Sequence, residues 1–588
     1  MQDLGGSSKE DLLIKISKLE KENSLLKRNK KFGLVWEDRP EKVATDCEVK
    51  LPVVKEVAEK AINEAGDDGP TNIIIEGDNY HALSVLNYTH NHGFDAIYID
   101  PPYNTGAKTW KYNNSYVDGQ DAFRHSKWLS FMAKRLNLAR DLLKDDGIIV
   151  VTIDDYEVAP LTLLMDEIFG EDNHLGTVVI KNNPSGRSTA SGFSIAHEYG
   201  LFYSRTPDAK VGRLERTEGQ IKRYKEQDSV GRFEWVNFRK HGGYRHESPK
   251  MYYPIYVDEK KNTIRIPDTK WDDTHKDWDI VEKPTLQEIV LYPIDESGTD
   301  RRWKWSIERA RKELHEMKIA PDRTGKTAVY IKSRMKDEGM LPLTWWDKTE
   351  YSATSQGTNL LAKIMPDGSP RFDYPKSLYA VMDSIRVLTE KKDARILDFF
   401  AGSGTTGHAV IELNKRDGGH RQFILCTNNE NGIAQEITYP RIKSVIEGYG
   451  DAEGIPANVR YFKTEFVEKD ETPDVLRRKL SPACEDMIRI REGAFDRVVD
   501  EDLFKVFKNP RGLTAVVFDR FGLQEYINRL EEMETDAPIH LYVFSYSKNN
   551  RLDELHGKLK HKYESQPIPE GVLEIYKKIF KNSKGGRK

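Results

Sequence analysis

The chain contains 588 residues, 38% hydrophobic and 32% charged, which at about 100–200 residues per domain describes a folded protein with three or four domains. Because no run of about 18 apolar residues occurs and polar residues follow Met1, we expect no membrane span, no secretory signal and a cytoplasmic location. The net charge of −4 argues against a generally basic nucleic-acid binder, and three widely spaced cysteines exclude a disulfide scaffold.

Residues 1–35 are predicted to form a helix with one apolar seam. The seam residues recur at spacings of four and three, with one polar member, and are Leu12, Ile16, Leu19, Asn23 and Leu26. This spacing is typical of a coiled coil, in which a buried Asn favours one register. A single surface helix is the alternative, because two heptads are fewer than the three or four that make the pattern specific. We expect the helix to join two copies into a homodimer.

Short apolar runs alternate with helix-like segments in two separate stretches, 36–180 and 346–458. The runs are 73–75, 94–99, 148–153, 394–400 and 422–426. Apolar runs without period-two alternation are typical of parallel strands that are buried on both faces. We therefore predict one α/β domain with a doubly wound, mostly parallel sheet, encoded in two pieces, and a domain inserted between them.

The predicted insert, 181–345, is irregular and aromatic. Seven of the ten tryptophans lie between 181 and 350, and residues 181–250 hold 14 basic and 8 acidic residues. A locally basic, aromatic segment is typical of a nucleic-acid reader, although a Trp-rich core with scattered surface charge has the same composition. Candidate phosphate or base contacts are Arg187, Arg232, Arg239, Lys240 and Arg245. After the second core piece, 459–588 is predicted to form a small α+β domain with strands at 513–518 and 539–544.

Residues 320–327 nearly match a phosphate-binding loop. The first glycine of that loop is replaced by Ala320, and the preceding 309–318 is interpreted as a helix rather than a strand. We therefore interpret 322–326 as a turn and expect no nucleotide hydrolysis. The spacing of the histidines fits no metal site, and none is expected.

The first motif with chemical content is Asp100-Pro101-Pro102-Tyr103, directly after a predicted strand. Open α/β sheets place their sites at such strand ends. Two prolines fix the backbone and remove two N–H donors, so the Asp100 carboxylate and the Pro101 carbonyl offer two acceptors side by side. They match an exocyclic amino group, which presents two N–H donors, and Tyr103 adds a flat face for a base. A rigid turn before a helix is the alternative.

The second motif, 398–407, reads DFFAGSGTTG and joins a predicted strand to a helix. Its glycines allow a ligand to approach the backbone and the helix N-terminus. Gly402, Gly404 and Gly407 also fit the dinucleotide pattern G-x-G-x-x-G, so an NAD-dependent oxidoreductase is one interpretation. That interpretation needs an acidic residue about 20 positions later, where Glu430 is late, and it leaves the first motif unexplained.

Taken together, the two motifs resemble those of the β-class DNA adenine-N6 methyltransferases, in which DPPY precedes a target-recognition domain and FxGxG follows it. Residues 372–378 resemble the KP-type motif of the family, with Ser377 in place of proline, and 76–78 resemble its acidic motif. The N-terminal helix, residues 32–37 and the C-terminal region resemble more narrowly the modification (Mod) subunit of type III restriction–modification systems.

The resemblance implies S-adenosylmethionine as the cofactor and duplex DNA as the partner, with 181–345 as the target-recognition domain. It implies transfer to adenine by Asp100, Pro101, Pro102 and Tyr103. The residues that it places near the cofactor are Asp78, Lys376, Ser377, Asp398, Phe400, Gly402, Gly404 and Glu430. A restriction (helicase-nuclease) subunit is a possible further partner, and the location implied is a prokaryotic cytoplasm, associated with the nucleoid.

Three alternatives stay open. A catalytically inactive DNA-binding specificity subunit is disfavoured by the two intact motifs. Cytosine-N4 methylation follows the same logic, but Asp100 favours adenine because the cytosine branch usually has Ser there. Cytosine-C5 methylation is set aside, because it needs a Cys nucleophile, usually after Pro, and no Pro-Cys pair occurs.

Overall fold

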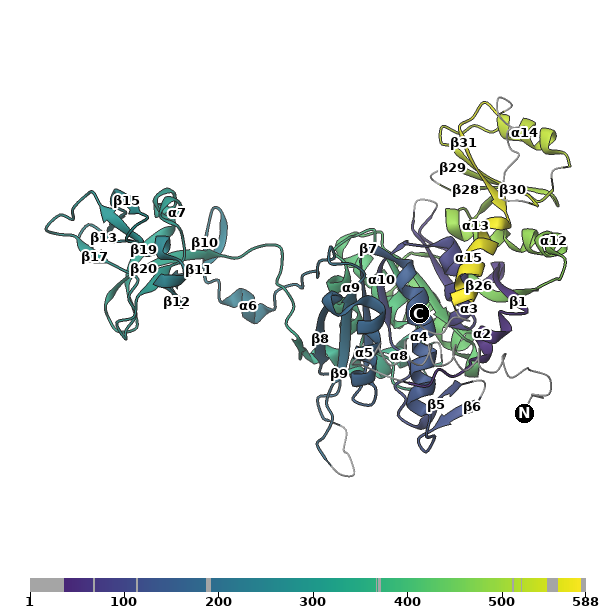
Figure 1. Ribbon diagram of the computed structural model, residues 1–588, viewed down its shortest axis with the longest axis horizontal. Coiled ribbons are helices and arrows are strands. Elements are labelled where there is room, and N and C mark those ends of the chain that lie inside the picture. The colour runs from purple at the N-terminus through teal and green to yellow at the C-terminus, as the bar shows by residue number, and fades with distance from the viewer. Residues whose placement is uncertain are drawn as a thin grey trace, which may run out of the picture. The chain divides into compact units, whose positions relative to one another are not determined.

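The computed structural model describes residues 36–582 except 67–68, 113–114, 187–191, 366, 369–371, 510–511, 520 and 547–558. The predicted N-terminal helix and Arg187 lie outside the described residues. The chain divides into two compact units, one formed by 1–212 with 341–588 and the other by 213–340, and Figure 1 shows the elements of each. Among the described residues, no helix is both long and apolar enough to cross a bilayer.

The first unit is built around an 11-stranded sheet with the order β1-β26-β3-β23-β22-β4-β7-β9-β8-β21, with β2 paired to β26. Six neighbouring strands, β26 to β7, run parallel, whereas β1 and β9 pair antiparallel to their neighbours. The strand bounds are β1 Lys50–Glu56, β2 Ile62–Asn63, β3 Thr71–Glu76, β4 Phe94–Ile99, β7 Leu143–Ile153, β8 His174–Ile180, β9 Glu198–Ser204, β21 Trp345–Trp346, β22 Arg395–Asp398, β23 Gln422–Thr427 and β26 Asn458–Glu468. The predicted doubly wound, mostly parallel α/β sheet is therefore confirmed.

Helices follow the strands and bury their apolar sides on the sheet. The helices of this domain are α2 Lys42–Asp46, α3 Asn79–Thr89, α4 Arg124–Leu142, α5 Val158–Phe169, α8 Asn359–Ile364, α9 Leu378–Leu388, α10 Thr405–Asp417 and α11 Tyr439–Glu447. One layer, α3 to α5, packs on the core that includes Ile97 and Ile99, while α10 contacts both α9 and α11 in a second layer. Strand β4 is buried at every residue, as the apolar run predicted, and its one charged residue, Asp95, is paired with Lys144 and Lys391.

The two pieces of the sheet meet at its centre. Strand β22 from the second piece pairs in parallel with β4 from the first, with Leu397 opposite Ile97. Residues some 300 positions apart thus end at the same edge of the sheet.

The insert differs in extent from the predicted 181–345. Strand β9 (Glu198–Ser204) pairs with β7, and β21 pairs with β8, so the ends of the predicted insert belong to the large sheet. The sequence concealed this because β9 returns antiparallel, outside the alternation of strand and helix. Strand β26 likewise belongs to this sheet rather than to the C-terminal region.

The second unit, 213–340, has small antiparallel sheets. Its main sheet has the order β10-β11-β20-β19, with bounds Glu226–Asp228, Gly231–Asn237, Thr327–Arg334 and Met317–Pro321. The other elements are α6 Glu218–Lys222, β12 Arg239–Tyr244, β13 Ile255–Asp258, β14 Thr263–Arg265, β15 Thr269–Asp272, β16 Asp277–Ile280, β17 Ile289–Leu291, β18 Arg301–Trp303 and α7 Ile307–Lys312. The unit begins and ends side by side, because Leu214 and Met340 form an antiparallel bridge with N–H to O distances of 2.9 Å in both directions.

The loop that resembled a phosphate-binding loop is the turn of a β-hairpin. Residues 322–326 join β19 to β20, and the Asp322 carboxylate accepts the Thr324 and Lys326 N–H groups. The interpretation of 309–318 as one helix was wrong, since α7 ends at Lys312 and β19 begins at Met317. A strand rather than a helix follows the turn, so the phosphate-binding geometry is absent there.

The C-terminal part of the first unit forms a five-stranded sheet, β27-β28-β29-β30-β31, which shares a hydrophobic core with α3 and β1. The bounds are α12 Pro473–Ala483, α13 Glu485–Glu492, β27 Asp496–Asp500, β28 Phe504–Asn509, β29 Gly512–Val517, α14 Leu523–Glu531, β30 Ile539–Phe544, β31 Tyr563–Ile568 and α15 Glu570–Asn582. The two strands predicted here are present, with α14 between them.

Candidate active site

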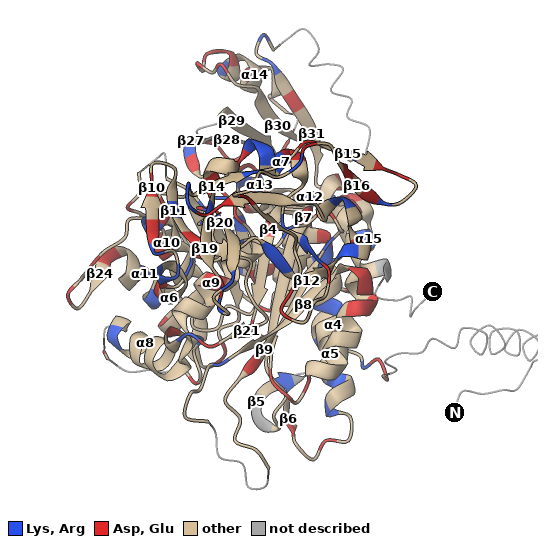
Figure 2. Cartoon of the chain, turned by 90° about the vertical axis from the view of Figure 1, so that its left-hand side faces the viewer, with Lys and Arg blue, Asp and Glu red and all other residues tan. Residues whose placement is uncertain are grey.

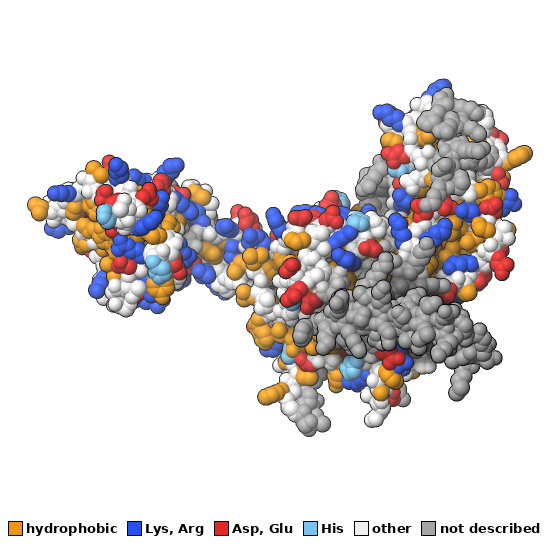
Figure 3. Space-filling model, in the orientation of Figure 1, with side chains coloured by type: hydrophobic (Ala, Val, Ile, Leu, Met, Phe, Trp, Pro, Cys, Tyr) orange, Lys and Arg blue, Asp and Glu red, His pale blue; other side chains and the backbone are white. Residues whose placement is uncertain are grey.

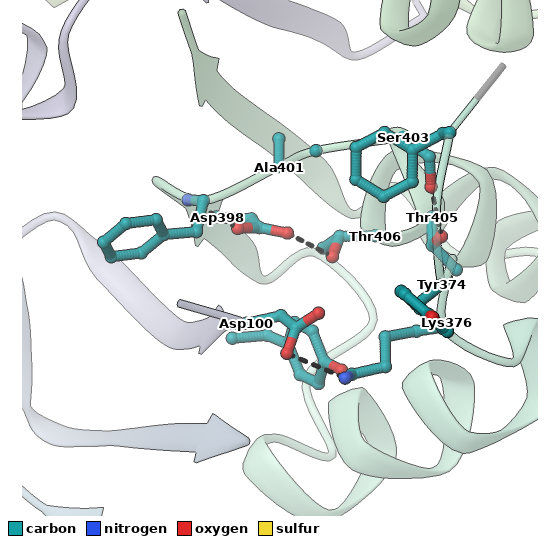
Figure 4. Close-up of a pocket in the computed structure, with 12 residues that line it drawn as sticks. Asp100, Tyr374, Lys376, Asp398, Ala401, Ser403, Thr405 and Thr406 are labelled. Carbon is teal, nitrogen blue, oxygen red and sulfur yellow. Dashed lines mark hydrogen bonds and ion pairs between the residues drawn. The ribbon is translucent and has the colours of Figure 1, made fainter. Parts of the chain in front are cut away.

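A pocket opens where β4 and β22 end, and both motifs line it (Figure 4). Its lining residues are Tyr98, Asp100, Phe372, Tyr374, Lys376, Asp398, Phe400, Ala401, Gly402, Ser403, Thr405 and Thr406. Both predicted motifs, at 100–103 and 398–407, therefore contribute residues to one pocket, as does the segment before α9.

Only one of the two oxygens of the Asp100 carboxylate has bonded partners among the described residues. Oδ1 accepts a hydrogen bond from Thr152 Oγ1 at 2.7 Å and lies 2.8 Å from Lys376 Nζ. Within the described part of the chain no donor is bonded to Oδ2. The carboxylate is thus fixed in orientation and keeps one oxygen available as an acceptor.

Lys376 lies between two carboxylates. Its Nζ is 3.0 Å from Glu198 Oε2, donates to Tyr103 Oη, and lies 4.6 Å from the centre of the Tyr103 ring. Burial alone would lower the pKa of Lys376, but the charges of Asp100 and Glu198 outweigh it and raise that pKa. The amine therefore stays charged and joins both acids.

The loop after β4, residues 100–104, is held in place by hydrogen bonds with buried side chains. Trp128 Nε1 donates to the Pro102 carbonyl at 2.7 Å, and the Tyr103 hydroxyl donates to Glu198 Oε2 at 3.0 Å. The Pro101 carbonyl accepts no hydrogen bond from the described residues. Asn104, which has a positive φ of 56° and is fully buried, donates to Glu157 Oε1 at 2.5 Å. These contacts position the loop while leaving the Pro101 acceptor unused.

The turn after β22 favours glycine at positions 402 and 404. Gly402 and Gly404 have φ values of 49° and 77°, which favour glycine, and a Cβ on Gly402 would lie 2.9 Å from Phe372 Cζ. Thr438 Oγ1 donates to the Gly402 carbonyl at 2.7 Å and fixes the turn. Helix α10 begins at Thr405, so its free N–H groups lie at the pocket.

Asp398 organises this turn from inside. Its Oδ1 accepts the Phe400 N–H at 2.9 Å, and its Oδ2 accepts Thr406 Oγ1 at 2.5 Å, as Figure 4 shows for the latter. Burial raises the pKa of Asp398 to about 7, with these two hydrogen bonds opposing the shift and the charge of Asp100 adding to it. Burial thus favours the protonated form of this carboxyl group relative to a free aspartate.

Four predicted cofactor residues do not line this pocket, namely Asp78, Ser377, Gly404 and Glu430, of which Gly404 lies in the glycine turn described above. Ser377 is buried and caps α9, with its hydroxyl donating to the Glu350 carbonyl at 2.7 Å. Asp78 caps α3 and lies 3.2 Å from Arg135 Nη2, and Glu430 is 41% exposed and lies 3.3 Å from Lys111 Nζ. Their contacts are those of structural residues, and a role at the cofactor stays a prediction for each.

Sequence reasoning missed Glu198 and Thr152. Thr152 is an ordinary residue in an apolar run, and Glu198 fell in the predicted insert. The only signal for Glu198 was an acidic residue directly before the apolar run 199–203. Its side chain is 4% exposed, which for a carboxylate requires partners such as Lys376.

Comparison with known proteins identifies the family of the chain. Residues 94–438, more than half of the chain, match the family model N6_N4_Mtase, described as DNA methylase. The chain belongs to this DNA methylase family. The match begins at β4 and ends with the residue before α11, and so includes both sides of the pocket.

Curated relatives include type II and type III enzymes. The type II methyltransferase M.KpnI of Klebsiella pneumoniae is 36% identical over 377 residues, 63% of this chain and 84% of that protein. The Mod subunit of the type III restriction-modification enzyme EcoPI of Escherichia phage P1 is 33% identical over 391 residues, 61% of this chain and 58% of that protein. The chain thus spans little more than half the length of this Mod subunit.

Among solved structures, the M1.HpyAVI–SAM complex is similar with a TM-score of 0.28 and 14% identity, over 63% of this chain and 98% of that one.

Proposed function

We propose that this DNA methylase transfers a methyl group from S-adenosylmethionine to N6 of an adenine that has left the duplex. The observation that carries the proposal is the single pocket shared by Asp100 and Gly402. One side offers acceptors for an amino group, and the other offers a glycine turn and a helix N-terminus for a cofactor.

The residues of the glycine turn fit S-adenosylmethionine. Gly402 has no Cβ to occupy the pocket, and Phe400 and Phe372 line it with apolar surface. We expect Asp398, Phe400, Gly402 and Gly404 to hold the cofactor, with Lys376 near its amino-acid end. When bound, the cofactor supplies a methyl group on an electrophilic sulfonium.

Asp100 and Pro101 act on the adenine. The N6 lone pair is delocalised into the ring, which makes the nitrogen a poor nucleophile. Asp100 Oδ2 and the Pro101 carbonyl would accept its two N–H groups and favour lone-pair density on nitrogen, while Pro102 keeps the loop rigid. Tyr103 would stack on the base and offset part of the stacking lost from the duplex. Positioning and local electrostatics would supply most of the acceleration.

Type III modification is the proposed biological setting. It is supported by the relatives, which include the EcoPI Mod subunit. In that setting the partners are duplex DNA, a second copy of the chain and a restriction subunit, all in a prokaryotic cytoplasm. The unit 213–340, within the predicted recognition domain 181–345, would read the target sequence.

The test is incubation of the full chain with methyl-labelled S-adenosylmethionine and mixed-sequence duplex DNA, followed by nucleoside analysis. We expect N6-methyl-2′-deoxyadenosine as the product. Asp100→Ala should abolish transfer but keep cofactor binding, whereas Asp451→Ala, at an exposed turn, should change neither. Cytosine-N4 product would replace the adenine proposal, and absence of any product with cofactor binding retained would favour the inactive specificity subunit. Full activity of Asp100→Ala would exclude the role given to Asp100.

A further inference from the structure

Arg441 contacts two of the residues that line the pocket, although it belongs to neither motif. It is on α11 and is fully buried. Its Nη1 donates to Thr405 Oγ1 at 2.8 Å, to Ser403 Oγ at 3.1 Å and to the Ser403 carbonyl at 3.3 Å. Ser403 and Thr405 themselves line the pocket. The guanidinium is thus separated from the pocket by two hydroxyl groups.

The positive charge of Arg441 has no counter-charge in the described part of the chain, where no carboxylate lies within 4 Å of it. Its Nε has no hydrogen-bond partner, and its Nη2 lies 3.4 Å from the buried ring nitrogen Nδ1 of His408. Burial lowers the pKa of Arg441 to about 9, so the group is still protonated at neutral pH. Other buried arginines of this unit are paired, as Arg135 is with Glu41 at 2.8 Å. A buried unpaired cation is costly unless an anion approaches it.

The hydroxyls beside Arg441 are oriented by it. A guanidinium only donates, so it occupies lone pairs of Ser403 Oγ and Thr405 Oγ1 and turns their hydrogens away from itself. The two oxygens are 3.2 Å apart, so one hydroxyl can donate to the other. No further acceptor is bonded to either hydroxyl among the described residues, and at least one hydrogen therefore remains for a ligand in the pocket. The N-terminus of α10, at Thr405, adds positive potential at the same place.

We propose that Arg441 is a positioning residue that makes Ser403 and Thr405 a subsite for the carboxylate of the cofactor's amino-acid half. This inference rests on the proposed function, because it takes S-adenosylmethionine as the ligand. A carboxylate accepts the free hydroxyl hydrogen and supplies the missing negative charge. The subsite lies in the same pocket as Lys376, whose charge is already shared by Asp100 and Glu198.

The experiment compares binding of S-adenosylmethionine with that of decarboxylated S-adenosylmethionine, which keeps the sulfonium and the amine but lacks the carboxylate. Calorimetric titration of the full chain without DNA gives both affinities. For Arg441→Met we expect about thirtyfold weaker binding of the first ligand and less than about twofold change for the second, because the lost interactions are charge-assisted hydrogen bonds. Arg441→Lys should lose less, since it keeps the charge.

The matched control is Arg421→Met, at a buried arginine paired with Asp417 at 2.8 Å, where neither affinity should change. If circular dichroism shows that Arg441→Met does not fold, Ser403→Ala/Thr405→Val tests the same subsite with Arg441 in place and should lower only the affinity for the carboxylated ligand. Equal losses for both ligands, or no loss, would overturn the inference. Failure of the unmodified chain to bind either ligand would instead overturn the proposed function.

Discussion

Charged residues have different roles in the two units. At the pocket of the first unit, acids at strand ends bind a few defined donors, as the partly buried Asp100 and the buried Glu198 do with Lys376. In the unit 213–340, many charges lie on the surface and pair with each other, and Figure 2 shows acidic and basic positions interleaved on its elements. The face of this unit in Figure 3 likewise mixes basic, acidic and hydrophobic side chains.

The difference shows why the amino-acid composition of a segment predicted functional residues less well than a sequence motif did. Two of the predicted DNA-contacting arginines are engaged within the unit, Arg239 with Glu296 at 2.6 Å and Arg245 with Asp277 at 2.7 Å. Lys240 is exposed, and no carboxylate lies within 4 Å of its amine in the described residues. A count of basic residues cannot separate these cases, whereas a strand end followed by a rigid acceptor pair identifies a place and a chemistry.

After the complete loss of transfer expected for Asp100→Ala, the next largest effect is expected from Glu198→Gln, which keeps the size and one acceptor but removes the charge. Lys376 would then pair with Asp100 alone and compete with the substrate for that carboxylate. We expect kcat to fall about 100-fold, the scale of small misplacements in active sites, with cofactor affinity nearly unchanged. Single-turnover methylation measures this. A loss confined to cofactor affinity would show that Glu198 serves the other side of the pocket.

A smaller effect concerns the pH dependence of stability at Asp398. The pKa of Asp398 is about 7 in the folded chain and near 3.8 in the unfolded chain. Protonation of Asp398 therefore stabilises the folded chain. This contribution is fully present below pH 4 and is lost as the pH rises to 7. Asp398→Asn removes this titration. Between pH 5 and 7 the unfolding free energy of the unmodified chain should fall by about 2 kcal/mol relative to the variant. Urea titrations at both pH values measure it, and parallel curves would contradict the shift.

Gly402→Ala should weaken cofactor binding about tenfold, because a Cβ there meets the Phe372 ring and requires a strained positive φ. Gly418→Ala is the matched control. Gly418 also has a positive φ, 65°, but nothing lies within 4 Å of its added Cβ. Both variants should lose stability, and only the first should lose affinity in a titration with S-adenosylmethionine. Equal affinities would remove Gly402 from the cofactor side.

The smallest effect tests the comparison of the two units directly. Lys240→Ala should lower affinity for non-specific duplex DNA about twofold and reduce the salt slope of binding by about 1, as for one phosphate contact. Arg245→Ala should leave that slope unchanged, since its charge is already used by Asp277 and Asp300. Fluorescence anisotropy over a range of salt concentrations measures both slopes. A lower slope only for Arg245→Ala would reverse the assignment.

Sequence patterns were sufficient to predict the parallel strands of the core and a motif on each side of the pocket. Apolar runs at 94–99 and 148–153 correspond to β4 and β7, because parallel strands buried on both faces leave a continuous signal. Antiparallel β9 and the short β21 carried no such signal, so the limits of the insert differ from the predicted ones. Arg441 and Glu198 could not be found, since a buried ion acquires its role only from side chains that the fold brings to it.

The adjacent ends of the inserted unit have an evolutionary consequence. Leu214 and Met340 are paired, so the whole of 213–340 leaves and rejoins the chain at one narrow junction. A segment attached in this way can be exchanged for another of different sequence without altering the strands that carry the chemistry. Because we propose that 213–340 reads the target sequence, recombination in the coding sequence on both sides of this unit would change the DNA site that is modified, while the transfer machinery is inherited intact.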